Sequence, residues 1–332
     1  MLATAPLGRT DMEITRVGFG AWALGGGDWA YAWGPQDDDE AVAAIRYAVE
    51  QGVNWIDTAA VYGLGHSEEV VARAVRALPE ADRPYVFTKC GLVWDEQDRS
   101  VEPHADGSAA SLRRELDGSL RRLGVERIDL YQVHWPPADG TPLEEYWATL
   151  LELKAAGKVR ALGLSNHDTD QLARAEALGH VDALQPPFSA IHRAAAGDLL
   201  PWCAEHGTGV IVYSPMQSGL LTGAFSAERV AGLPSNDWRR QDPDFTEHLD
   251  ANLAVADALA EVARRHDVPV PAAAVAWTLG FGAVTGAIVG ARRPEQVDGW
   301  RAAASLTLDE DDYATVAAAI GKHEAGEGPV RP

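Results

Sequence analysis

Three ionisable side chains of different types each stand at the end of a short apolar run of strand length. Asp57 closes VNWID, Lys89 closes YVFTK and His134 closes IDLYQVH. In a parallel α/β barrel the catalytic groups lie where strands end and loops begin, so these three side chains would converge at one rim. Each has an ordinary explanation when taken alone, such as a structural ion pair, but their coincidence indicates a catalytic site.

Tyr62 follows Asp57 in DTAAVYGLGHSEE, in the turn before the second expected helix. We expect its phenol to lean over the barrel mouth beside Lys89, whose ammonium would lower the pKa of Tyr62 from about 10. Asp57 would keep Lys89 in place and charged. His134 would bind the substrate oxygen or share the proton, so that Tyr62 acts as an acid in reduction and as a base in oxidation.

The elements that must position these residues form a regular alternation. Strand-length apolar runs are separated by helix-like segments, and no linker divides the chain into halves. The runs are ITRVGFG, VNWIDT, YVFTKC, IDLYQVH, VRALGLS, VDALQP, GVIVYSP and GAIVGA. Eight alternations favour one α/β domain over residues 1–332, a (β/α)8 TIM barrel, rather than an open doubly wound sheet.

Two segments depart from the strand and helix alternation. The stretch PLGRTDMEITRVGFG has Thr10 and Asp11 between two apolar pieces, which predicts an N-terminal β-hairpin covering one barrel end. Residues 216–247 are rich in Gly, Pro and polar residues. A loop this long within a compact domain is usually functional, so we expect a lid or a mobile segment there.

Composition excludes several classes of protein. The 332 residues are 46% hydrophobic and 23% charged, as in a globular protein, and 49 acidic against 28 basic residues give a net charge of -21. That charge repels nucleic acid and anionic membranes, so we expect neither as a partner. With two cysteines, no signal-like start and no run of ~18 apolar residues, we expect a cytoplasmic protein.

Other chemistries lack their sequence patterns. Residues 18–23, GFGAWA, match the G-x-G-x-x-A dinucleotide fingerprint, but three glycines and then Pro35 follow where a helix should open. Histidines and cysteines show no metal-ligand spacing, so we expect catalysis without a metal and disfavour a metal-dependent barrel lyase. The nucleophile-elbow pattern G-x-S-x-G is missing, which weakens a hydrolase interpretation.

The strings DTAAVYG, TKCG, SLRRLGVERIDLYQVHWP, GKVRALGLSN and YSPMQSGLLTG resemble those of the aldo-keto reductases. The resemblance runs from about Leu7 to the last expected helix. It implies reversible, NADPH-dependent reduction of aldehydes or ketones to alcohols, with hydride from the nicotinamide and a proton from Tyr62. By motif matching, Asp57, Tyr62, Lys89 and His134 take the catalytic positions of that family.

The resemblance also implies a cofactor site. Side-chain amides and a hydroxyl suit the nicotinamide carboxamide, an aromatic face suits its ring, and a glycine-containing loop supplies N–H groups to the pyrophosphate. Other contacts border the dinucleotide near the first two strands or hold its adenosine end. The implied contacts are Gly20, Trp22, Asp57, Ser165, Asn166, Gln185, Tyr213, Ser214, Gly219, Leu220, Gly290, Arg292 and Gln296.

At the adenosine end the sequence departs from a common pattern of the family. Arg292 suits a 2′-phosphate through charge-assisted hydrogen bonds, so we expect NADPH, with NADH as the alternative. Trp300 stands where relatives often have an asparagine. Its ring could stack near adenine, but an indole cannot replace the paired hydrogen bonds of an amide.

The substrate site is expected to be apolar. Trp22, Trp29, Trp33, Trp94 and Trp135 lie in loops after the first, third and fourth strands, which suits a bulky or aromatic carbonyl compound. A different class of function stays open. Some barrel proteins that resemble this family are nucleotide-binding regulatory subunits, like the potassium-channel beta subunits. An assay for turnover of carbonyl compounds distinguishes a reductase from such a subunit. The sequence does not indicate an oligomeric state.

Overall fold

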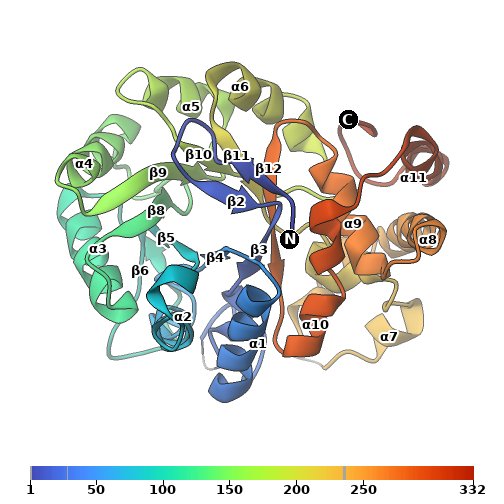
Figure 1. The fold of residues 1–332 in the computed structure, drawn as a ribbon, viewed down its shortest axis with the longest axis horizontal. Helices are drawn as coiled ribbons and strands as arrows, with labels where there is room; N and C mark the ends of the chain where they lie inside the picture. Colours follow the sequence, from blue (N-terminus) through green and yellow to red (C-terminus); the bar gives the residue numbers. More distant parts are fainter. Residues whose placement is uncertain (1, 28, 235–236) are drawn as a thin grey trace.

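The fold is a closed barrel of parallel strands with helices outside it, in a computed structural model that describes residues 2–27, 29–234 and 237–332 (Figure 1). Neighbouring strands follow the order β10-β11-β12-β3-β4-β5-β8-β9, which confirms the predicted barrel. These strands are β3 (Val17–Gly20), β4 (Trp55–Asp57), β5 (Tyr85–Cys90), β8 (Ile128–Val133), β9 (Val159–Ser165), β10 (Ala183–Gln185), β11 (Gly209–Val212) and β12 (Val284–Gly290).

The predicted N-terminal hairpin is present. β1 (Thr4–Pro6) pairs antiparallel with β2 (Glu13–Thr15), and the hairpin crosses one end of the barrel in Figure 1. Its buried side chains Leu7, Met12 and Ile14 join one cluster with residues from inside the barrel, including Trp55. Burial of these apolar groups closes the amino-terminal end of the barrel and leaves the carboxyl end for chemistry.

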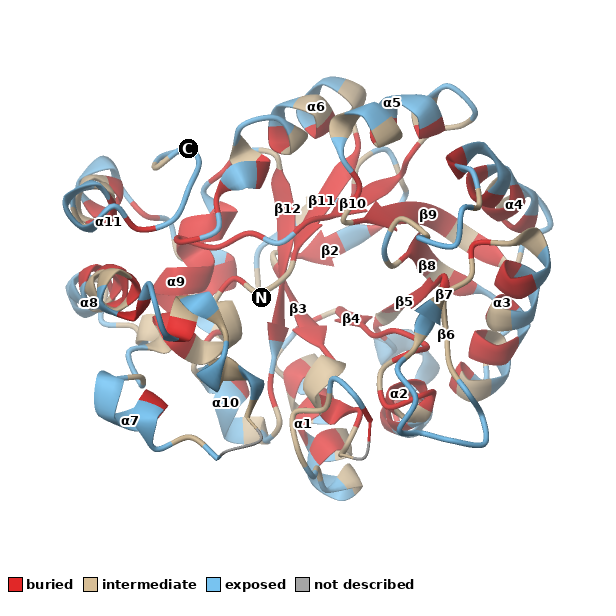
Figure 2. Cartoon of the chain, turned by 180° about the vertical axis from the view of Figure 1, so that it is seen from behind, coloured by how far each residue is buried: buried red, intermediate tan, exposed pale blue. Residues whose placement is uncertain are grey.

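The helices turn their buried faces to the barrel (Figure 2). Local signals fix several ends: Asp37 caps α1, Asp168 and Gln171 form a capping box on α5, and Gly124 ends α3 in the left-handed region. The longer helices are α1 (Asp38–Glu50), α2 (His66–Arg76), α3 (Ala109–Leu123), α4 (Leu143–Ala155), α5 (Thr169–Glu176), α6 (Leu199–His206), α8 (Leu249–Arg265), α9 (Val270–Leu279) and α11 (Glu310–His323), with the short α10 (Pro294–Asp298).

The segment 216–247 is built from short helical turns, where the sequence suggested a loop. It contains η4 (Gln217–Thr222), α7 (Ala227–Ala231), η5 (Trp238–Arg240) and η6 (Pro243–Phe245), and residues 235–236 lie outside the described residues. Leu220, Leu221 and Phe245 are fully or almost fully buried, which anchors the segment to the body of the barrel. Its role as a lid or mobile segment stays a prediction.

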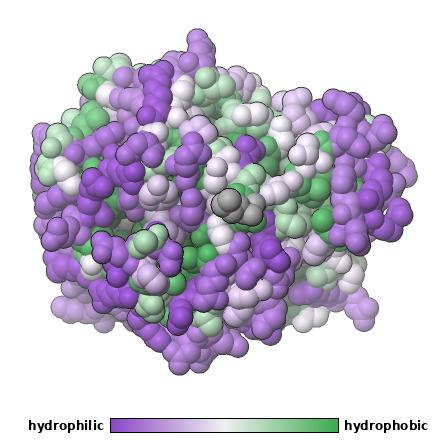
Figure 3. Space-filling view, in the orientation of Figure 1, coloured by the Kyte–Doolittle hydropathy of each residue, from purple (hydrophilic) through white to green (hydrophobic). Residues whose placement is uncertain are grey.

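The face shown in Figure 3 is mostly hydrophilic, with hydrophobic residues in small patches between hydrophilic ones. This agrees with the excess of acidic residues that gives the chain its net charge of -21. Among the described helices, none combines the length and the hydropathy that a membrane crossing needs.

Candidate active site

Strand alternation explains how the predicted residues reach one place. Successive side chains of a strand point to opposite faces, so a residue two positions after a side chain of the barrel interior also faces inward. Trp55, Phe87 and Leu130 belong to the interior cluster. The interior positions that follow them are Asp57 on β4, Lys89 on β5 and Gln132 on β8, with His134 directly after the end of β8.

The structure brings the four predicted catalytic residues together. Lys89 Nζ donates to Asp57 Oδ2 at 2.5 Å, to the carbonyl of Thr58 at 3.0 Å and to Tyr62 Oη at 3.4 Å. The His134 ring meets the Tyr62 ring edge-on, with centroids 5.5 Å apart. An ammonium, a carboxylate, a phenol and an imidazole therefore lie together at the carboxyl rim, which is an arrangement suited to proton transfer.

The loop that carries Tyr62 is fixed by a close backbone approach. A Cβ on Gly63 would lie 2.1 Å from the carbonyl oxygen of Gly25, and Gly63 has φ +61. Only glycine fits both the contact and the conformation. The β3–α1 loop, which contains η1 (Trp22–Leu24), is thereby docked directly against the turn that presents the phenol.

The expectation that Lys89 lowers the pKa of Tyr62 is wrong. Burial, followed by the negative charge of Asp57, raises the pKa of Tyr62 well above its usual value. The ammonium is paired at 2.5 Å with Asp57, so the phenol faces a nearly neutral ion pair rather than a free cation. Tyr62 is accordingly a neutral phenol across the physiological pH range, which is the form a proton donor requires.

Burial also lowers the pKa values of the two basic members. For Lys89 the opposing charge and hydrogen bond of Asp57 limit this effect. For His134, burial and then the positive charge of Lys89 lower the pKa well below its usual value. His134 is therefore a neutral imidazole, able to donate one hydrogen bond to an oxygen without carrying a charge.

A residue that we did not predict lies beneath this group. Gln132 is fully buried, and its Nε2 lies 3.4 Å from Asp57 Oδ1. Gln185 Nε2 donates to the same oxygen at 2.9 Å and to Gln132 Oε1 at 3.2 Å. A polar residue at an inward-facing strand position between Leu130 and His134 was the available sequence signal.

The residues proposed for the carboxamide are adjacent and hydrogen-bonded to one another. Ser165 Oγ donates to the carbonyl of Gln185 at 2.9 Å, and Asn166 Nδ2 donates to Ser165 Oγ at 3.0 Å and to the carbonyl of His134 at 2.9 Å. Tyr213 Oη donates to Asn166 Oδ1 at 2.8 Å. These contacts fix the side chains beside the Asp57 group, at the ends of β9, β10 and β11.

The loop proposed for the pyrophosphate has an unusual backbone. Ser214, Gln217, Ser218 and Gly219 all have positive φ, and Leu220 behind them is buried. Left-handed residues turn successive N–H groups toward one side, which is the geometry of an anion-binding nest. Such conformations cost free energy at residues other than glycine, and they concentrate at functional sites.

At the expected adenosine end, Gly290 lies opposite Gly20 in the β12–β3 pair. Arg292 donates from Nε to Gln36 Oε1 at 2.6 Å and from Nη2 to the carbonyl of Pro35, so it ties the β3–α1 loop to β12. Gln296 Oε1 accepts the N–H of Arg292 at 2.7 Å and thus caps α10.

Trp300 does not take the position suggested for it. The side chain is 1% exposed and packs in the main core between the barrel and its helices. Its ring therefore cannot stack on adenine, because the large apolar surface of the indole is more stable in the core than at the groove.

Most of the predicted tryptophans surround the phenol. Trp22, Trp29 and Trp94 pack in one cluster with Tyr62. Trp33 meets Trp22 edge-on with centroids 5.3 Å apart, and on its other side meets Trp238 of the 216–247 segment at 5.9 Å. Trp135, directly after His134, is exposed. The aromatic wall thus joins the β3–α1 loop to the 216–247 segment.

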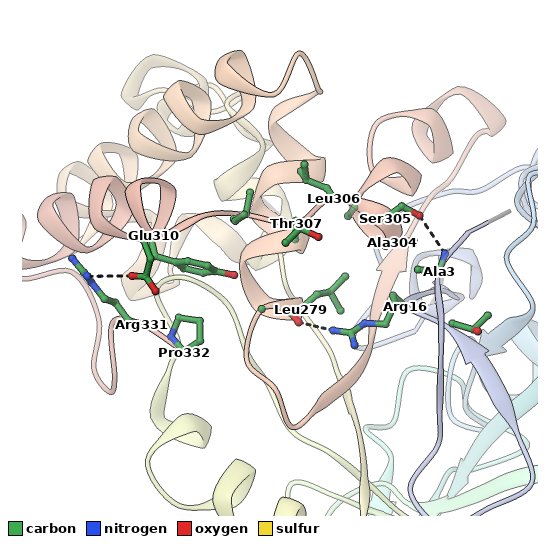
Figure 4. Close-up of a pocket in the computed structure, with 16 residues that line it drawn as sticks. Ala3, Arg16, Leu279, Ala304, Ser305, Leu306, Thr307, Glu310, Arg331 and Pro332 are labelled. Atoms are coloured by element: carbon green, nitrogen blue, oxygen red, sulfur yellow. Dashed lines mark hydrogen bonds and ion pairs between the residues drawn. The ribbon is translucent and has the colours of Figure 1, made fainter.

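Two cavities lie outside the Asp57 group. One of about 560 Å³ lies at the hairpin end, between β1, α9, η7 (Arg301–Ser305) and α11, and contains none of the predicted site residues (Figure 4). A second, of about 460 Å³, is lined by Gly25, Gly26, Gly27, Leu64, His66, Glu69 and Arg99, beside the Tyr62 turn. Across the described part of the chain, no three His, Cys, Asp or Glu side chains cluster as metal ligands would.

Fold and site together define an α/β-barrel protein with an acid–base group at its carboxyl rim, built on a buried ion pair. The model of the Aldo/keto reductase family matches residues 16–320, and the chain belongs to that family. It is an aldo-keto reductase, an enzyme class that uses nicotinamide cofactors.

Named relatives agree with this assignment. The chain is 36% identical to the NADH-specific methylglyoxal reductase of Escherichia coli (strain K12), over 92% of this chain and 95% of that protein. It is 34% identical to aldo-keto reductase YhdN of Bacillus subtilis (strain 168), over 91% and 89% of the two chains. The glycerol dehydrogenase AKR11B4 from Gluconobacter oxydans superimposes with a TM-score of 0.89 at 36% identity, covering 98% and 97%.

Proposed function

We propose that the protein reduces aldehydes or ketones to alcohols with NADPH, and that Tyr62 is the proton donor. The observation that carries the proposal is the contact chain from Asp57 through Lys89 Nζ to Tyr62 Oη, with His134 against the same phenol ring. A partly buried phenol hydrogen-bonded to an ion pair has a proton to donate and a charged group beside it that stabilises the phenolate.

Each of the four side chains has its own role in the proposed reaction. Neutral His134 donates a hydrogen bond to the substrate carbonyl oxygen and orients it. Tyr62 gives its proton to that oxygen as negative charge develops there. Lys89 stabilises the phenolate that remains, and Asp57 holds Lys89 in position at 2.5 Å. The reduced nicotinamide, when bound, supplies the hydride.

Residues at the nicotinamide end fit that cofactor. Asn166 is fixed by bonds to Ser165, His134 and Tyr213, and Gln185 has both protons of its amide nitrogen engaged within the protein, which leaves its Oε1 for a ligand. The positive-φ residues 217–219 suit a pyrophosphate.

The preference for NADPH rests on Arg292. Its guanidinium donates to Gln36 and to the backbone carbonyl of Pro35, which are neutral oxygens, so the positive charge stays available to a phosphate. The E. coli relative is an NADH-specific enzyme, and the choice between the two cofactors in this chain is therefore a property to measure.

The aromatic wall favours apolar or aromatic carbonyl compounds. Trp22 and Trp29 lie 6.4 and 6.5 Å from the Tyr62 ring, centroid to centroid, and give flat apolar surfaces beside the proton donor. We expect aromatic aldehydes to have lower KM values than methylglyoxal, the small aldehyde named in the E. coli relative.

One experiment tests the function. Protein, NADPH and a panel of aldehydes are mixed, and the absorbance of the reduced nicotinamide is followed. We expect turnover that Tyr62→Phe lowers by roughly 10² to 10⁴ in kcat without a loss of cofactor affinity. Tyr131→Phe is the matched control, because it removes a phenol oxygen from the outward face of β8. Full activity in Tyr62→Phe would refute the proton assignment, and tight NADPH binding without turnover would favour a regulatory subunit.

A further inference from the structure

The cavity at the hairpin end of the barrel contains an arginine, Arg16, that the proposed reaction does not use. Arg16 directly precedes β3, whose other end, Gly20, pairs with Asp57 at the carboxyl rim. The cavity and the Asp57 group therefore lie at opposite ends of the barrel. With a volume of about 560 Å³, the cavity falls within the size range of small-molecule sites.

The charge of Arg16 has no carboxylate partner in the described part of the chain. The one hydrogen bond that its guanidinium makes there runs from Nη2 to the carbonyl of Leu279, the last residue of α9, at 2.5 Å. A guanidinium has five N–H donors, and a backbone carbonyl carries no net charge to balance it. Burial lowers the pKa of Arg16, but the side chain is still a cation at physiological pH.

The other two charged side chains of the cavity compensate each other. Glu310 and Arg331 approach to 3.9 Å, and Figure 4 shows this pair on one side of the cavity and the bond of Arg16 to Leu279 on the other. Arg16 is then the one charge in excess, within a chain whose net charge is -21. A cavity that keeps a single positive charge in so acidic a protein favours a ligand with a single negative charge.

Hydroxyl groups lie beside this charge. Tyr313 Oη packs on the end of α9, where a Cβ on Gly280 would lie 1.6 Å from it, next to the residue that Arg16 binds. Burial raises the pKa of Tyr313 to about 12, so the phenol is a neutral donor. Ser305 and Thr307 also line the cavity, and none of the three hydroxyls donates its proton to another described residue.

Much of the remaining surface of the cavity is apolar. Burial of these side chains in the protein leaves hydrocarbon surface beside the guanidinium, and an apolar ligand tail gains affinity with each methylene that it removes from water. The buried apolar side chains of the lining are Ala276, Leu279, Ala303, Ala304 and Leu308.

We propose that this cavity binds a small monocarboxylic acid, with the carboxylate on Arg16 and Tyr313 Oη and the hydrocarbon tail on the alanine and leucine side chains. A carboxylate accepts two parallel bonds from a guanidinium and brings one negative charge. A phosphate dianion would bring a second charge toward Glu310 and nothing for the apolar surface. The site is separate from the cofactor and does not depend on the proposed function.

Isothermal titration calorimetry tests the site with hexanoate as the probe. The proteins are the wild type, Arg16→Met, Tyr313→Phe and, as the control, Arg293→Gln, which removes an exposed arginine outside the cavity. Hexanamide, acetate and inorganic phosphate are titrated into the wild type. Hexanamide keeps the tail and removes the charge, whereas acetate keeps the charge and removes most of the tail.

We expect Arg16→Met to weaken hexanoate binding by at least about tenfold and Tyr313→Phe by about three- to tenfold, with Arg293→Gln within about twofold of wild type. Hexanamide and acetate should each bind the wild type about tenfold more weakly than hexanoate. The ligand comparison and Tyr313→Phe keep the test decisive if Arg16→Met fails to fold. No binding at about 10 mM hexanoate, equal binding of hexanoate and phosphate, or full affinity in Arg16→Met overturns the proposal.

The active site is the competing location, because His134 and Tyr62 also offer donors to a carboxylate. Hexanoate affinity should therefore stay within about twofold when NADPH is present in excess, and within about twofold in Tyr62→Phe. Binding that is lost in Tyr62→Phe and kept in Arg16→Met would put the acid at the active site and overturn the proposal. A protein that binds hexanoate through Arg16 but turns over no aldehyde would refute only the proposed function.

Discussion

Lys89 and Asp57 form an ion pair from which water is almost excluded. Nζ and Oδ2 are 2.5 Å apart, and the two side chains are 0% and 4% exposed. A buried pair adds little net stability over apolar residues, but removal of one partner leaves an uncompensated charge in a medium of low dielectric. Replacing one partner should therefore destabilise the protein strongly, whereas replacing both partners together should destabilise it much less.

The first prediction follows from that asymmetry. Lys89→Met should lower the free energy of unfolding by about 3 to 5 kcal/mol, because Asp57 is left buried without its cation. The double variant Asp57→Asn, Lys89→Met should lose less than the sum of the two single changes. Urea denaturation of the four proteins gives the coupling energy, and simple additivity would contradict the buried-pair description.

The second prediction concerns the adenosine end. Arg292→Gln should weaken NADPH binding by about 10- to 100-fold and leave NADH binding within about twofold, since the guanidinium serves the 2′-phosphate. Arg293→Gln is the control, because Arg293 is the exposed neighbour on the same turn. Titration by fluorescence quenching measures the affinities of wild type and both variants for each nucleotide. Equal losses for both nucleotides would show that Arg292 acts through the β3–α1 loop alone.

The third prediction concerns pH. Burial raises the pKa of Glu115 to about 7, although its oxygens accept bonds from Gly91 N–H at 2.9 Å and from Ser111 Oγ at 3.3 Å. The folded protein thus holds this proton more tightly than the unfolded chain. The stability that results is full below about pH 4.5 and is lost as the pH rises through 7.

Glu115→Gln removes the titration and keeps the shape. The unfolding free energy of the variant, relative to wild type, should therefore rise by about 1 to 2 kcal/mol between pH 5 and pH 8, less than the full equivalent of the shift because Glu115 keeps some contact with solvent. Denaturant titrations at both pH values measure this difference. A difference that is the same at pH 5 and pH 8 would contradict a raised pKa.

The fourth prediction uses two glycines at the end of α9. A Cβ on Gly280 would lie 1.6 Å from Tyr313 Oη, whereas a Cβ on Gly282 would meet nothing within 4 Å. Gly280→Ala should cost about 1 to 3 kcal/mol because the tyrosine ring must move, and Gly282→Ala should stay within about 0.5 kcal/mol of wild type. Thermal unfolding compares them, and equal melting temperatures would argue against the close contact.

The strands and the rim could be predicted because their signals are local. Short apolar runs with polar ends are enough to place Asp57, Lys89 and His134 at one rim once the barrel is assumed. Helix α9 has no such local signal, because VPAAAVAWTL is buried on nearly all sides and shows no polar face. Its periodicity carries no information about its position.

Contacts between residues that are far apart in the sequence could not be predicted from local patterns. The direction of the Tyr62 pKa shift depends on whether Lys89 is free or paired, and the sequence does not give the 2.5 Å contact with Asp57. In the same way, nothing near Arg292 in the chain indicates that it binds Gln36, 256 positions away. The strand alternation predicts that Gln132 faces the barrel interior. A single glutamine within an apolar strand does not, however, indicate a role before its contacts are known.

The backbone contact between Gly25 and Gly63 has a consequence for how such an enzyme can change. Gly25 ends the turn that carries Trp22, and Gly63 directly follows Tyr62. A substitution that reshapes the β3–α1 loop for a new substrate therefore also shifts the acid. Changes in this loop therefore alter substrate range and reaction rate together. To alter substrate range alone, substitutions belong in the 216–247 segment, on the other side of the aromatic wall.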